Sequence, residues 1–79
     1  MPLYRVNYGE GYEFMAQTPV EVVYEMQRRH LSGRGMSEEK FMRRAAMEMC
    51  EWNGKNYYFC SKERFAKSMI DNGLLEIVD

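Results

Sequence analysis

The chain has 79 residues and a formal net charge of −1, and 46% of its residues are hydrophobic and 29% charged. A chain of this length makes one domain, residues 1–79, and buries only about 60% of the surface that it exposes when unfolded. This composition is typical of a globular protein and excludes a disordered or low-complexity chain. No apolar run reaches the ~18 residues of a membrane span and no signal-peptide pattern is present, so we expect a cytoplasmic protein without a membrane partner.

The N-terminal residues predict a β-hairpin. Apolar and polar side chains alternate on both sides of a Gly-Glu-Gly turn at residues 9–11. With Tyr8 opposite Tyr12, one register explains both faces of the hairpin. It gathers the aromatic and aliphatic side chains on one face and places Arg5 opposite Met15 on the other.

Capping signals predict three helices after the hairpin. Thr18, followed by Pro and three residues later by Glu21, forms a capping box, and Ser37 and Ser61 begin two further helices. Gly73 suits the left-handed residue that ends the last helix. Apolar residues on the helix faces and in the hairpin predict one core. Its expected members include Phe14, Val23, Phe41, Met49, Trp52 and Phe65.

Asn53-Gly54 is open to two interpretations. It can end the second helix, or it can be the turn of a second hairpin between residues 47–52 and 55–60. We favour the helix because residues 43–51 contain no β-branched side chain and are rich in strong helix formers.

Tyr57–Cys60 is short and aromatic and predicts a third strand, and residues 75–78 suit either a fourth strand or an ordered tail. The expected order is ββααβα with this optional C-terminal strand. The fold class is therefore α+β, with a small antiparallel sheet covered by three helices in two layers.

Residues for metal or covalent chemistry are scarce. Cys50, Cys60 and His30 are the only cysteines and the only histidine. Structural zinc sites commonly use four ligands with cysteines in close pairs, and these cysteines lie far apart in the chain. We therefore expect buried free thiols, no metal and no cofactor. Known catalytic motifs are also missing, so we expect neither an enzyme nor a small-molecule substrate.

Positive charge is concentrated in residues 28–44, which hold six basic and two acidic side chains. This segment is a candidate contact for nucleic acid or for an acidic protein, and the ordinary alternative is a solvated helix surface. The candidate basic residues are Arg28, Arg29, Arg34, Lys40, Arg43 and Arg44.

Methionine is abundant, with eight residues in the chain. Met26, Met42, Met49 and Met69 lie on predicted core faces, but Met15 points to the far face of the hairpin and Met47 lies among charged residues. These two are the candidate apolar interface.

The layout resembles that of short uncharacterised proteins of bacterial genomes and mobile elements. Four features carry the resemblance: Tyr4-Arg5-Val6, Thr18-Pro19-Val20-Glu21, Ser61 with Phe65, and Gly73-Leu74. The resemblance implies a bacterial, cytoplasmic origin and no assigned activity.

From these observations we expect a small, non-catalytic interaction or regulatory module. It would contact another protein or a second copy of itself. The alternative is a nucleic-acid-associated accessory protein that uses the Arg-rich segment.

Overall fold

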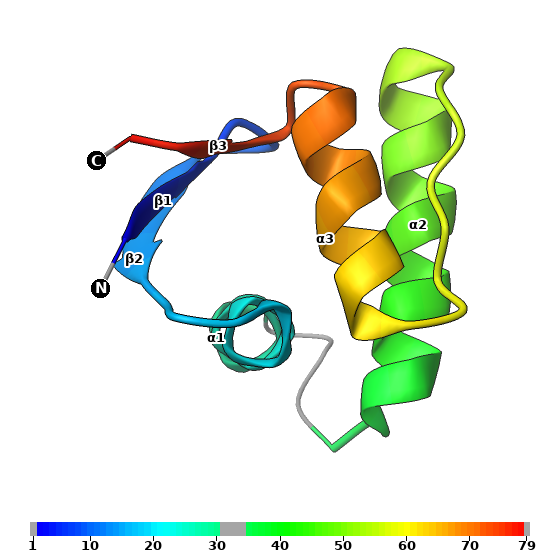
Figure 1. The fold of residues 1–79 in the computed structure, drawn as a ribbon. Coiled ribbons are helices and arrows are strands. Elements are labelled where there is room, and N and C mark those ends of the chain that lie inside the picture. Colours follow the sequence, from blue (N-terminus) through cyan, green and yellow to red (C-terminus); the bar gives the residue numbers. More distant parts are fainter. Residues whose placement is uncertain (1, 31–34, 79) are drawn as a thin grey trace.

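Three helices lie on one side of a three-stranded antiparallel sheet in the computed structural model, which describes residues 2–30 and 35–78 (Figure 1). In chain order the elements are β1 (Leu3–Val6), β2 (Tyr12–Met15), α1 (Pro19–Arg29), α2 (Glu38–Asn53), α3 (Lys62–Asp71) and β3 (Leu75–Ile77). The strands are ordered β2-β1-β3, and α2 lies farthest from the sheet. The α+β class and the antiparallel sheet with three helices confirm the prediction.

The hairpin has a different register from the predicted one. Val6, and not Tyr8, lies opposite Tyr12, and Arg5 lies opposite Glu13. The shift is by two residues, so each side chain keeps its predicted face because side chains alternate along a strand with a period of two. Arg5 now forms an ion pair with Glu13 at 2.9 Å on the outer face of the sheet.

Beyond Val6 the chain pairs with β3 and no longer with β2. The Asn7 backbone N–H donates to the carbonyl of Leu74 at 2.8 Å, which continues the β1–β3 register by one pair. The Tyr8 ring packs edge-on against Trp52 with centroids 5.6 Å apart, and its hydroxyl donates to the Glu48 carboxylate at 3.4 Å. These contacts leave a longer loop, up to residue 11, than the predicted three-residue turn.

The third strand is β3, and not the predicted strand at residues 57–60. β3 pairs antiparallel with β1 and places Leu75 opposite Val6. In Figure 1, α2 and α3 run in the same direction, so the chain between them must return along α2, away from the sheet. That geometry gives residues 57–60 no strand to pair with, and the order becomes ββαααβ.

The predicted helix ends are confirmed. The side chains of Thr18, Ser37 and Ser61 cap the N-termini of the three helices. Gly54 follows α2 with φ of 73°, which settles the helix interpretation of Asn53-Gly54 against the hairpin. After α3, the Leu74 N–H donates to the carbonyl of Met69 at 2.9 Å, as in a Schellman motif.

The core lies between the sheet and the helices and contains all but one of the predicted members. Phe65, Met49 and Val23 are almost fully buried, whereas Trp52 is 58% exposed. Tyr57 is buried beside the last turn of α2, where its hydroxyl accepts a hydrogen bond from Asn53 Nδ2 at 2.6 Å. Trp52 packs edge-on against Tyr8 of the hairpin loop and is not part of the core.

We expect Phe65→Ala and Trp52→Ala to differ sharply in stability. Phe65 is 0% exposed, so its truncation leaves a cavity and costs about 3–5 kcal/mol. Trp52→Ala loses mainly an edge contact between two rings, which contributes about 0.5–1.5 kcal/mol. Urea unfolding monitored by circular dichroism measures both values. Equal losses would show that Trp52 belongs to the core after all.

Candidate functional site

The segment at residues 55–60 is extended along α2 and is held by side chains of α2 and α3 (Figure 1). Tyr57 is 7% exposed and is the buried residue of the segment. The Tyr58 N–H donates to Ser68 Oγ on α3 at 3.2 Å, and the Ser68 hydroxyl donates to the carbonyl of Phe65 at 2.9 Å. The segment therefore has a defined orientation without any strand pairing.

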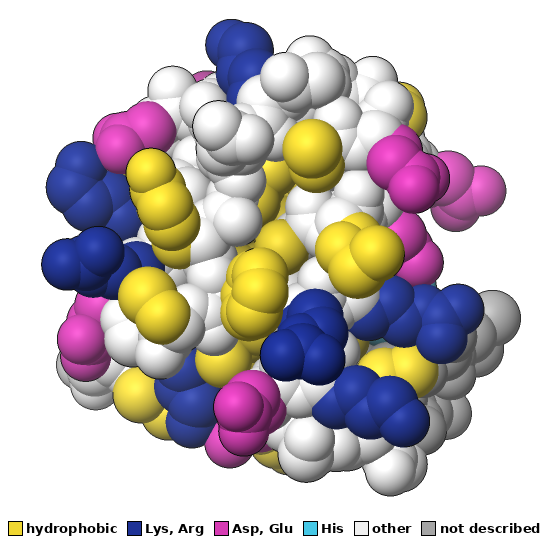
Figure 2. All heavy atoms as spheres, turned by 90° about the vertical axis from the view of Figure 1, so that its right-hand side faces the viewer, with side chains coloured by type: hydrophobic (Ala, Val, Ile, Leu, Met, Phe, Trp, Pro, Cys, Tyr) yellow, Lys and Arg dark blue, Asp and Glu magenta, His cyan; other side chains and the backbone are white. Residues whose placement is uncertain are grey.

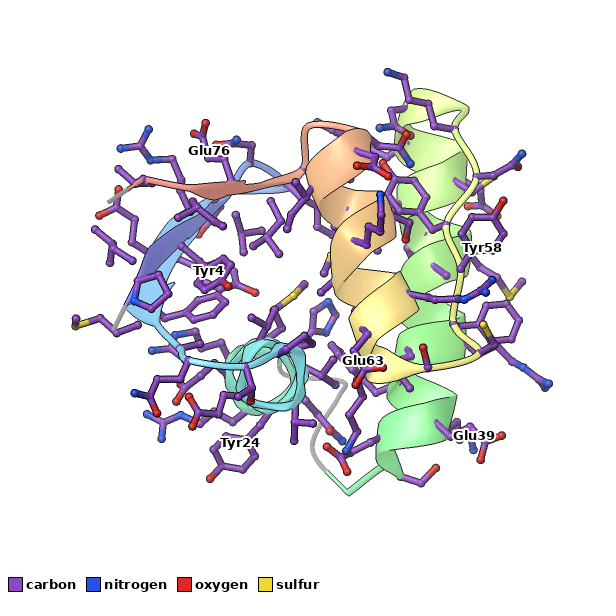
Figure 3. The ribbon with its side chains drawn as sticks, in the orientation of Figure 1. Tyr4, Tyr24, Glu39, Tyr58, Glu63 and Glu76 are labelled. Atoms are coloured by element: carbon purple, nitrogen blue, oxygen red, sulfur yellow. The ribbon has the colours of Figure 1, made fainter. Side chains whose placement is uncertain are left out.

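With Tyr57 inward, the next side chains point outward. Tyr58 is 57% exposed and points away from the molecule in Figure 3, and Phe59 is 38% exposed. Met47 on α2 is 60% exposed, and Cys50 and Cys60 are exposed. We call this group the Phe59 patch; its members are Met47, Cys50, Tyr58, Phe59 and Cys60.

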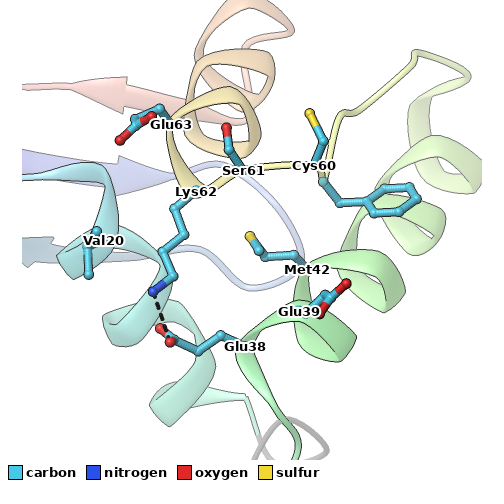
Figure 4. Close-up of a pocket in the computed structure, with 9 residues that line it drawn as sticks. Val20, Glu38, Glu39, Met42, Cys60, Ser61, Lys62 and Glu63 are labelled. Carbon is cyan, nitrogen blue, oxygen red and sulfur yellow. Dashed lines mark hydrogen bonds and ion pairs between the residues drawn. The ribbon is translucent and has the colours of Figure 1, made fainter.

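Phe59 lies between two hollows. The smaller one, about 310 Å³, is lined mainly by apolar side chains, including Met47, Cys50 and Tyr57. The larger one, about 690 Å³, lies between the N-termini of α2 and α3 and has Met42 in its lining (Figure 4). An ion pair of 2.9 Å between Lys62 Nζ and Glu38 crosses this larger hollow.

Arg43 connects the patch to positive charge. Its guanidinium lies 5.6 Å from the centroid of the Phe59 ring, a cation–π contact. Lys40 precedes Arg43 by one helical turn and is also exposed. Among the residues that the structure describes, neither cation has a carboxylate within 4.0 Å.

The other candidate basic residues are distributed differently. Arg28 and Arg29 both pair with Glu25 on their own helix, and Arg29 also lies over the rings of β2. Arg44 pairs with Glu48. Arg34 lies outside the described residues. Figure 2 shows hydrophobic side chains near the middle of the face beyond α2, with Lys and Arg side chains at several places around them, including the lower right and the left edge.

The two candidate methionines are not brought together. Met15 is 54% exposed on β2, which lies at the opposite side of the molecule from α2 (Figure 1). Met47 belongs to the Phe59 patch, so the structure gives it apolar neighbours that Met15 does not share.

A third hollow, about 430 Å³, lies between the hairpin loop, the end of α1 and α2. Tyr8, Tyr12, Arg29 and His30 bring polar groups to its lining. Burial raises the pKa of Tyr12, and burial together with the carboxylate of Glu48 raises the pKa of Tyr8. Both phenols therefore stay protonated near neutral pH and can donate hydrogen bonds but are poor nucleophiles.

Both cysteines are free thiols at the surface, so the prediction that they are buried is wrong. Cys50 lies on the outer side of α2, and Cys60 follows Phe59 on the exposed connection. Within residues 2–30 and 35–78, no group of three or more histidine, cysteine or acidic side chains is placed to hold a metal ion.

Comparisons with family models, with curated proteins and with solved structures find no match to this chain. In the described part of the chain, no helix has the length and apolar character to cross a membrane.

Sequence reasoning missed the Phe59 patch because it assigned the aromatic run to a strand and its rings to packing. One signal was available. Three consecutive aromatic residues in an extended chain point to alternating sides, so a sheet with one covered face leaves at least one ring exposed.

We expect Ser68→Ala to loosen the 55–60 segment, because it removes the acceptor of the Tyr58 N–H. The stability loss should be about 1 kcal/mol, and the Tyr58 amide should exchange faster with deuterium. Ser61→Ala removes the cap of α3 at a similar cost and is the matched control. Equal Tyr58 exchange in the two variants would contradict the assigned role of Ser68.

Proposed function

We propose that this chain is a non-catalytic interaction module that binds a protein partner through the Phe59 patch. One observation carries the proposal. This small domain exposes a group of apolar side chains whose backbone is held in place by buried contacts. Tyr57 and Ser68 fix the backbone, and Phe59 and Met47 share the lining of a hollow. A preformed apolar surface loses less conformational entropy on binding than a mobile loop does.

The composition of the patch supports a protein contact. Aromatic residues and methionine are enriched at protein interfaces, and arginine is enriched among the side chains that contribute most to binding. Here Phe59, Tyr58 and Met47 lie beside Arg43. The bacterial origin and cytoplasmic location stay predictions from the sequence, and a reducing compartment agrees with two exposed thiols.

Nucleic acid is the second candidate partner. Exposed Tyr58 and Phe59 next to Lys40 and Arg43 could stack bases and contact phosphates. Such binding weakens steeply with salt because each neutralised phosphate releases counterions. We rank it second because Arg28, Arg29 and Arg44 each pair with a carboxylate.

The test is affinity capture from a lysate of the native cells with three baits. The baits are the wild-type protein, Met15→Asp and Phe59→Asp. We expect the wild-type protein and Met15→Asp to capture the same partners. The captured amount should fall by about tenfold or more with Phe59→Asp, because an interface tolerates a desolvated charge poorly. Met15 is the control because it is also an exposed apolar side chain, 54% against 38% for Phe59, and lies on the far side of the molecule.

Two further measurements identify the other kinds of partner. Sedimentation of wild-type and Phe59→Asp protein detects a second copy as the partner. Nuclease treatment of the lysate and titration of labelled oligonucleotides at two salt concentrations detect nucleic acid. If all three baits captured the same partners, the proposed function would be wrong.

A further inference from the structure

We infer that the hollow between the hairpin loop, the end of α1 and α2 binds a small neutral molecule, a flat apolar ring that carries one hydrogen-bond acceptor. The volume of this hollow, about 430 Å³, lies in the range of ~300–1,000 Å³ that is usual for small-molecule sites. Its lining shares no residue with the Phe59 patch. The inference therefore stands apart from the proposed protein contact and adds a second site.

The floor of the hollow is apolar and is part of the core. Met26 reaches it from α1, and Phe41, Ala45 and Met49 reach it from α2. The three residues on α2 are spaced by four, so they lie along one side of that helix. None of the four side chains is more than 6% exposed. Because core packing holds them, the floor exists before a ligand arrives.

Aromatic rings surround this floor. Tyr8 and Tyr12 belong to the hairpin, and His30 follows α1. The Tyr8 ring is held edge-on by Trp52, and the His30 ring lies edge-on to Phe41 with centroids 5.9 Å apart. Rings prefer edge-on or offset contacts with other rings, so this lining suits a flat aromatic group better than a flexible chain.

The charges around the hollow favour a neutral ligand. Arg29 pairs with Glu25 on its own helix. His30 Nε2 lies 3.9 Å from the carboxylate of Glu48, and Glu10 brings a further carboxylate on the exposed loop. An ionised ligand of either sign would meet a like charge here, and it would lose part of its hydration to an apolar floor.

The Tyr12 hydroxyl is the group that orients the ligand. It makes no hydrogen bond with any described residue, whereas the Tyr8 hydroxyl donates to Glu48 at 3.4 Å. Burial raises the pKa of Tyr12, so its O–H stays a donor near neutral pH. The position of the ring is fixed because Tyr12 pairs with Val6 in the sheet. A carbonyl or ether oxygen is the acceptor that such a donor needs.

The experiment titrates two probes of similar shape into the intact protein and follows the backbone amide NMR signals. Acetophenone is a neutral ring with a carbonyl acceptor, and ethylbenzene lacks the acceptor. We expect saturable shifts at Gly9 and Gly11 of the hairpin loop, with an affinity for acetophenone that is about millimolar for so small a molecule.

Two variants separate the hydrogen bond from the ring contacts. Tyr12→Phe should weaken acetophenone by about threefold to tenfold and leave ethylbenzene unchanged, since only acetophenone uses the hydroxyl. Tyr24→Phe is the matched control, because Tyr24 is 55% exposed and points away from the molecule in Figure 3. Phe59→Asp should leave both probes unchanged.

Four outcomes would overturn the inference. Shifts that do not saturate, or that centre on the Phe59 patch, would remove the site. Tighter binding of benzoate or benzylamine than of acetophenone would contradict a neutral ligand. An equal effect of Tyr12→Phe on both probes would contradict the role of the hydroxyl. Shifts of the loop amides with protein concentration alone would identify a second copy of the chain as the occupant.

Discussion

The parallel direction of α2 and α3 is the constraint on which the candidate surface depends. Two successive helices that point the same way need a connection as long as a helix, and here residues 54–61 run back along α2. A connection without strand pairing must be held by side chains. Tyr57 packs into the core, Ser68 accepts from the backbone of Tyr58, and Asn72 Nδ2 donates to the carbonyl of Asn56 at 2.8 Å. Because these contacts occupy the inner side of the segment, the rings of the next two residues face solvent.

The sequence predicts the local structure well and the long-range pairing poorly. Caps and stop signals act within a few residues, so Ser37, Ser61 and Gly73 predicted helix ends that the structure confirms. Strand partners depend on contacts between distant parts of the chain. β1 pairs with β2 on one side and with β3, near the other end of the chain, on the other, and the Asn7 backbone N–H bonds to the carbonyl of Leu74. The same limit explains the wrong third strand, since aromatic β propensity describes a pleated, half-buried environment and not a particular partner.

The candidate site was predicted only in part. Met47 was expected at an interface because it is apolar among charges, and the structure adds Phe59 and an adjoining hollow as its neighbours. Trp52 was expected in the core because it continues the apolar stripe of the helix, but it is exposed at the end of α2 and packs against Tyr8 of the hairpin loop. Helical periodicity says which residues share a side of a helix. It does not say which other segment covers that side, and this depends on the fold of the whole chain.

A domain of this size needs most of its apolar side chains in the core, so the exposed rings of Tyr58 and Phe59 are informative. At about 60% burial, stability depends on a few large side chains, and Phe65, Met49 and Met69 lie almost fully inside. Isolated exposed apolar residues such as Met15 are ordinary on any protein surface. The Phe59 patch differs because several exposed apolar side chains gather on a backbone that buried contacts hold, beside a hollow that Phe59 and Met47 both line. Gathered exposure on a held segment favours a contact surface over a loop that merely connects two helices.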